Sequence, residues 1–176
     1  MKTTIHCSEL FKQEEGSPCC EKMLRKIESV FSDYLEDTKV LPEITEECEI
    51  SLAFADEDQI EPINEEYRDE DGSTDVLSFP MWENEEGGFE PPDDWPCLTL
   101  GDIIVCKEIV AKNAEENGKS EKDELLLVIC HGFLHLIGFD HADDAEKEIM
   151  WREQDRLLES MRKISEQEPE DPEIER

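Results

Sequence analysis

The sequence is poor in basic residues. Only 17 of its 176 residues are Lys or Arg, whereas 49 are Asp or Glu, so the formal net charge is −32. A charge of this size keeps a protein soluble and repels bare nucleic acid at long range. It argues against a protein that finds RNA or DNA by electrostatic attraction alone. Docking to basic partners and adaptation to salt both remain open as explanations of the acidity.

The sequence also lacks the marks of secreted and membrane proteins. Its seven cysteines are odd in number and no pair has the C-x₂-C spacing of a zinc knuckle, so no disulfide framework is indicated. The first residues include no apolar signal segment, and the longest apolar run, LLLVIC, is too short to cross a bilayer. We therefore expect a cytoplasmic protein with reduced thiols.

Apolar periodicity predicts an α+β fold, with a small mixed sheet of about four strands packed against about five helices. Strands are expected at 3–7, 48–55, 75–80 and 98–106, and a Gly in the last one indicates a bulge or close backbone approach. Helices are expected at 18–35, 57–67, 107–117, 120–137 and 144–161. We expect one domain over residues 1–162, a surface flap over 82–97, and an acidic, disordered tail over 163–176.

Three of the four histidines lie within the eleven residues HGFLHLIGFDH. His131 and His135 are four positions apart, so they share one face of a helix. Gly138 can end that helix in a left-handed conformation, after which His141 can return as a third ligand. Three neutral imidazoles with an open fourth position form the catalytic zinc arrangement. The pattern predicts a zincin-like metal helix with one Zn²⁺, although nickel, copper or iron also accept imidazoles.

Other features of this segment refine the prediction. Asp140 and Asp144 are candidates to accept hydrogen bonds from the imidazole N–H groups. The spacing H-x₃-H-x₂-G-x₂-H also occurs in metzincin proteases, which need Glu directly after the first His as general base. Gly132 occupies that position here, so a protease is disfavoured.

Three segments of this sequence match the motifs of one known family. HGFLHLIGFDH matches H-G-x-L-H-L-x-G-Y-D-H, with Phe139 in place of Tyr. INEEYRDEDGSTDVLSFP matches N-x-x-Y-R…TDVLSFP, and LGDIIV matches L-G-D-I-x-I. Together these segments resemble the YbeY family of endoribonucleases. The resemblance implies a metal-dependent, single-strand-specific endoribonuclease that acts on rRNA of the small ribosomal subunit, in maturation and quality control. Ribosomal proteins or an Era-type GTPase are the further partners expected.

Arg68 is the only Lys or Arg between residues 40 and 106, and acidic residues surround it in the sequence. An ordinary surface ion pair would explain it and contribute little. A phosphoryl-transfer site, however, needs a fixed cation, and guanidinium fits phosphate geometry. The family resemblance implies that the Arg at this position of the Y-R motif is functional. Asp75, Ser78 and Asp102 are weaker candidates for the site, and no residue identifies itself as general base.

Two alternatives to the nuclease stay open. One is another metal-dependent hydrolase with the same three histidines. The other is a non-enzymatic ribosome assembly factor whose metal is structural and whose acidic surface binds basic ribosomal proteins. The net charge of −32 favours the assembly factor more than it favours an enzyme that binds RNA unaided.

Overall fold

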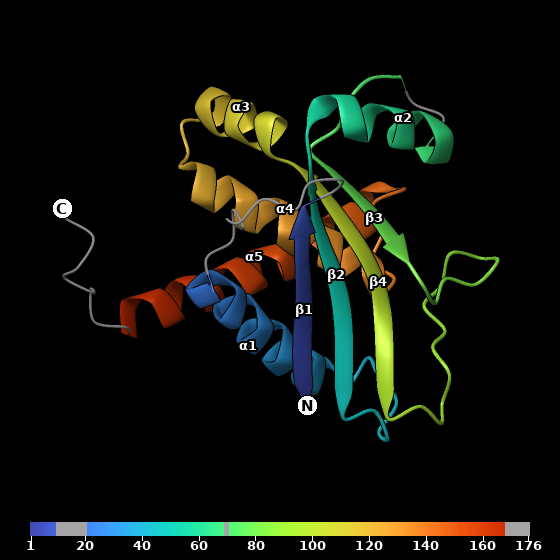
Figure 1. The fold of residues 1–176 in the computed structure, drawn as a ribbon. Helices are drawn as coiled ribbons and strands as arrows, with labels where there is room; N and C mark the ends of the chain where they lie inside the picture. The colour runs from blue at the N-terminus through green and yellow to red at the C-terminus, as the bar shows by residue number, and fades with distance from the viewer. Residues whose placement is uncertain (10–20, 69–70, 168–176) are drawn as a thin grey trace.

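The structure is a computed structural model that describes residues 1–9, 21–68 and 71–167 (Figure 1). The described part contains the strands β1 (Lys2–Glu9), β2 (Glu47–Ala55), β3 (Val76–Pro80) and β4 (Cys97–Cys106). It contains the helices α1 (Glu21–Thr38), α2 (Glu57–Arg68), α3 (Lys107–Asn117), α4 (Glu121–Leu136) and α5 (Asp144–Gln167). The predicted α+β class, with four strands and five helices, is confirmed.

The four strands form one mixed sheet in the order β1-β2-β4-β3. Strands β1, β2 and β4 are parallel, and β3 runs antiparallel to β4 at the edge. Because parallel neighbours need a long crossover, α1 connects β1 to β2. Figure 1 shows α1, α4 and α5 together on one face of the sheet. The arrangement places β3, the short edge strand, beside the helix that carries the first two histidines.

Helix α4 is the centre of the core. Nine of its residues are buried, so it is apolar almost all round. It packs against β3 and β4 on one side and α5 on another. The Phe133 ring stacks on Phe31 of α1 with centroids 3.8 Å apart, and Tyr34 meets Phe133 edge-on at 5.9 Å. A helix held on several sides gives its side chains fixed positions.

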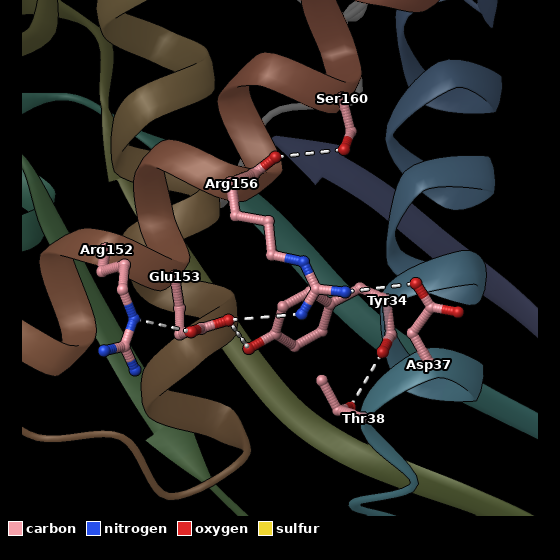
Figure 2. A network of polar contacts seen from close by, with 7 residues as sticks. All are labelled: Tyr34, Asp37, Thr38, Arg152, Glu153, Arg156 and Ser160. Atoms are coloured by element: carbon pink, nitrogen blue, oxygen red, sulfur yellow. Dashed lines mark hydrogen bonds and ion pairs between the residues drawn. The ribbon is translucent and has the colours of Figure 1, made fainter.

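Helix α5 is fixed to α1 by a polar network (Figure 2). The Tyr34 hydroxyl donates to Glu153 Oε2 at 3.1 Å, and burial together with that carboxylate raises the pKa of Tyr34. Arg156 donates to Asp37 at 3.1 Å and to Glu153 at 3.5 Å, with its guanidinium 5.2 Å from the Tyr34 ring centroid. These contacts set the rotation of α5 about its axis. They therefore also set the direction in which the next residue, Gln154, points.

Gly101 marks the bulge that the sequence indicated in β4. The pairing of β2 with β4 shifts register between Glu49 and Ile50, which leaves Leu100 as the extra residue. Gly101 has φ of 142°, and a Cβ there would lie 2.1 Å from the carbonyl oxygen of Phe79. The missing side chain therefore allows β3 to pair closely with β4.

The predicted helix boundaries hold at the starts better than at the ends. Asp56 and Gln59 form a reciprocal cap at the start of α2, with hydrogen bonds of 2.9 and 3.0 Å. Helix α5 extends to Gln167, so 163–167 are helical, contrary to the expected disordered tail. Its amphipathic spacing continues beyond the predicted end, as Ile164 packs on the core. The rest of the tail, 168–176, lies outside the described residues, as does the predicted start of the first helix at 18–20.

The described residues bear on two other expectations. Four of the described cysteines are free thiols, namely Cys48, Cys97, Cys106 and Cys130. A search of the described helices finds none with the length and apolar character needed to cross a membrane.

The bulge gives a test of the sheet. Gly101→Ala should lower the free energy of unfolding by about 1–3 kcal/mol more than Gly72→Ala, because only Gly101 faces a backbone oxygen. Gly72 is the matched control, since it also has positive φ, of 95°, but open space around it. Urea unfolding followed by circular dichroism measures both. Equal stabilities for the two variants would contradict the close approach of β3 to β4.

Candidate metal centre

Local signals in the sequence explain why α4 and the turn after it carry the site. Ser120 caps the helix by accepting a bond from the amide of Asp123 at 3.1 Å. The helix ends at Leu136, and Gly138 follows with φ of 87°, as predicted. A Cβ on Gly138 would lie 2.6 Å from Cβ of Phe89, so the flap packs directly on this turn. The tight turn returns the chain toward the helix just before His141.

The structure brings the three predicted histidines together. One ring nitrogen from each of His131, His135 and His141 can be chosen so that all three lie within 4.8 Å of one another. The Nε2 atoms of His131 and His135 are 3.2 Å apart. Two nitrogens bound at about 2.0–2.1 Å to a tetrahedral ion would be about 3.3 Å apart. The donor set and its spacing therefore fit a metal ion.

The surroundings of His131 and His135 on α4 favour the neutral form of both imidazoles. Burial, followed by the neighbouring imidazoles, lowers the pKa of His135 to about 4. Burial also lowers the pKa of His131, with the hydrogen bond to Gln154 acting in the opposite direction. The positive charge of Arg68 contributes to the lowering at both. Neutral imidazoles keep the lone pair that a metal ligand needs.

Gln154 is a site residue that the sequence analysis missed. Its Oε1 lies 3.2 Å from Nδ1 of His131. Because an amide oxygen only accepts, Nδ1 carries the hydrogen and Nε2 is left to face the other histidines. Asp140, which was expected to accept a hydrogen bond from an imidazole, instead accepts one from the backbone N–H of His141 at 2.8 Å. The signal in the sequence was weak, since Gln154 is 23 residues from His131 on another helix.

Arg68 and His135 line the same cavity, which has a volume of about 400 Å³. Arg68 is the last residue of α2, and the buried side chain of Asn64 ties that helix to the following loop by donating to the Gly72 carbonyl at 2.9 Å. Within the described residues Arg68 makes no ion pair, although its neighbours 69 and 70 lie outside them. It is the one cation among the described residues that line the cavity.

The three weaker candidates have different positions. Asp75 is held by Asn113 of α3 at 3.2 Å, and its charge acts to raise the pKa of His131. Ser78 lines the cavity, and its buried Oγ has no hydrogen-bond partner among the described residues. Asp102 is exposed, pairs with Phe79 of β3 and is not among the residues that line the cavity. The structure therefore does not bring Asp102 to the histidines.

Gly132 lacks space for the carboxylate that a metzincin would carry there. A Cβ on Gly132 would lie 2.9 Å from Cγ2 of Ile103 and 3.0 Å from Oγ of Ser78. The branched Ile103 side chain has little freedom to move away. The position faces β3 and β4 rather than the cavity, so it is a packing contact. This geometry supports the prediction that the protein is not a metzincin-type protease.

Fold and site together define an α+β protein with a cluster of three histidines, able to hold a metal ion, beside a cavity lined by one arginine. Comparison with known families gives the particular one. The family profile described as Endoribonuclease YbeY matches residues 13–162. The chain belongs to the YbeY family of endoribonucleases.

Individual relatives agree. Endoribonuclease YbeY of Micrococcus luteus is 42% identical over 115 residues, which cover 65% of this chain and 71% of that protein. Endoribonuclease YbeY of Agrobacterium fabrum is 40% identical over 133 residues, covering 76% of each. A solution structure of a protein from Thermotoga maritima matches with a TM-score of 0.54 and 27% identity, covering 98% of this chain and 99% of that one.

The contact of Gln154 with His131 predicts an effect on metal affinity. Gln154→Ala should weaken Zn²⁺ binding by about 10- to 100-fold, because the His131 tautomer is no longer fixed. Gln154→Glu should bind at least as tightly as the wild type, since a carboxylate accepts the same bond more strongly. Competition with a chromophoric chelator measures both.

Asp155→Ala is the control for the Gln154 variants, because Asp155 is the exposed next residue of α5. It should leave Zn²⁺ affinity unchanged. If Gln154→Ala binds Zn²⁺ as Asp155→Ala does, Gln154 has no part in positioning His131.

Proposed function

We propose that this protein is a cytoplasmic, zinc-dependent endoribonuclease that cuts single-stranded rRNA of the small ribosomal subunit, in its maturation and quality control. The observation that carries the proposal is the position of Arg68 and His135 on one cavity wall. Membership of the YbeY family supports the ribonuclease activity. The assignment of rRNA as the substrate rests on the family resemblance described in the sequence analysis.

His131, His135 and His141 would hold the metal. Three neutral imidazoles are the ligand set of many catalytic zinc sites, which keep one position open. When bound, a divalent ion supplies Lewis-acid chemistry to a phosphate ester. The remaining tasks of binding the backbone, orienting the scissile group and countering its charge belong to side chains of this protein.

Arg68 is the side chain that we assign to the scissile phosphate. A guanidinium can donate two parallel hydrogen bonds to phosphate oxygens, which both orients the group and opposes the negative charge that develops. Its exposure and its lack of an ion pair among the described residues leave these donors available. Because Arg68 is the one described cation that lines the cavity, a phosphate group would be bound there and at few other positions of this acidic protein.

We assign supporting roles to two of the weaker candidates. Asp75 would hold His131 electrostatically, because its carboxylate is fixed by Asn113 and acts on that imidazole. Ser78 would shape the cavity wall beside His135. Asp102 has no role in this proposal, since it does not line the cavity.

The acidic surface implies that the substrate is delivered. A charge of −32 provides no long-range attraction for RNA. Basic ribosomal proteins, or an Era-type GTPase, would bring the protein to the subunit. The same charge favours one alternative, a non-enzymatic assembly factor with a structural metal, which the following experiment separates from the nuclease.

The test combines metal content with cleavage of a single-stranded rRNA fragment. Wild type should hold about one zinc per chain and cut the fragment, and His135→Ala should lose both properties. Arg68→Ala should keep the metal but cut about 100- to 1,000-fold more slowly, because a donor to the charged transition state is gone. Arg68→Lys should recover only part of the rate, since an ammonium cannot donate in the same two-bond geometry.

Two matched controls lie away from the cavity. His6 is an exposed histidine beside Glu49, and Arg25 is an exposed arginine paired with Glu21. His6→Ala and Arg25→Ala should retain both metal and activity. A wild-type protein that holds metal but never cuts RNA would support the assembly factor instead, and equal activity of Arg68→Ala and Arg25→Ala would remove Arg68 from the mechanism.

A further inference from the structure

The cavity beside the histidines is rich in aromatic side chains. The chain has twelve aromatic residues, three Trp, two Tyr and seven Phe, and five of them are among the fourteen residues that line this one cavity. The five come from separate parts of the chain: Tyr67, Phe79, Trp82, Phe89 and Phe139. The core takes most of the others, so the aromatic residues outside the core are concentrated at the site.

Most of these rings are already occupied by packing within the protein. The indole of Trp82 donates to the Thr99 carbonyl at 2.8 Å and meets Trp95 edge-on at 5.4 Å. Phe89 packs on the turn at Gly138, and Phe139 packs against the core. These rings form part of the cavity wall. Because they are packed within the protein, they offer no open face on which a ligand ring could stack.

Tyr67 differs from the others because 64% of its surface is exposed. Its ring meets Phe79 edge-on, with centroids 5.1 Å apart, so it is supported from one direction and open elsewhere. It directly precedes Arg68 at the end of α2. An open aromatic ring therefore lines the same cavity as the guanidinium that we assign to the phosphate.

We propose that Tyr67 stacks on one unpaired nucleobase of the RNA, in the cavity next to the phosphate bound by Arg68; this inference rests on the proposed function. A volume of about 400 Å³ is in the range of sites for small ligands. Base stacking on an aromatic side chain is independent of sequence and of net charge. A protein with charge −32 needs a contribution of this kind, because phosphate attraction is weak for it.

The same contact accounts for a preference for single strands. In a duplex both faces of a base are covered by its stacked neighbours, so no face is available to Tyr67. An unpaired base can turn one face to the ring while its phosphate stays near Arg68. Tyr67 is therefore a specificity-determining residue, and its effect should fall on binding more than on the rate at saturation.

Equilibrium binding of a short, fluorescein-labelled single-stranded DNA tests the contact, because DNA presents the same base faces and a ribonuclease leaves it intact. Tyr67→Leu should bind this probe about 5- to 100-fold more weakly than the wild type, as expected for the loss of one stacked base. Tyr67→Phe should retain most of the affinity. A perfect duplex of the same sequence should bind the wild type more weakly than the single strand, and Tyr67→Leu should hardly change its binding.

Trp151→Leu is the matched control, because Trp151 is an aromatic residue of α5 with 53% exposure that does not line this cavity. If Tyr67→Leu binds the probe as Trp151→Leu does, while both still cut RNA, the stacking contact is wrong and the nuclease stands. If the wild type cuts no RNA and does not bind the probe, the proposed function falls and the stacking contact falls with it.

Discussion

The close packing of α4 on β3 and β4 is the constraint on which the site depends. Gly132 is the contact point, where even one added carbon would meet Ile103 and Ser78. From this fixed helix, His131 and His135 project on one side, and the turn at Gly138 brings His141 back to them. The polar network between α1 and α5 then sets Gln154 against His131. The packing of α4 and the contact with Gln154 therefore fix the positions of His131 and His135, and the turn at Gly138 directs His141 toward them.

The acidic charge and the exposed aromatic ring of Tyr67 would have opposite effects on binding of the proposed RNA substrate. Its surface is strongly acidic, and the cavity has one described cation, Arg68, next to the exposed ring of Tyr67. Such a protein gains little from general attraction to nucleic acid and must rely on short-range contacts. Under the proposed function, low affinity for free RNA and delivery by a partner would both follow from this composition. Cutting would then be restricted to the place where a partner brings the protein.

The sequence was sufficient for the elements and the histidine cluster because their signals are local. Spacing of four residues, a helix-ending glycine and the Asp56–Gln59 cap each depend on neighbours in the chain. Contacts between distant elements were not predictable in this way. Gln154 reaches His131 from another helix, and Asp102 does not line the cavity although it lies in a strand that packs on α4. These positions depend on helix rotation and strand facing, which periodicity does not fix.

We expect one metal ion to bind between His131, His135 and His141. Metal content alone is a weak test, because 49 carboxylates offer many adventitious sites. Anomalous X-ray diffraction at the zinc absorption edge, on crystals of protein purified without added metal, locates the ion directly. The account predicts one strong peak at about 2.0–2.1 Å from a ring nitrogen of each of the three histidines. A peak bound by surface carboxylates, with none between the histidines, would contradict it.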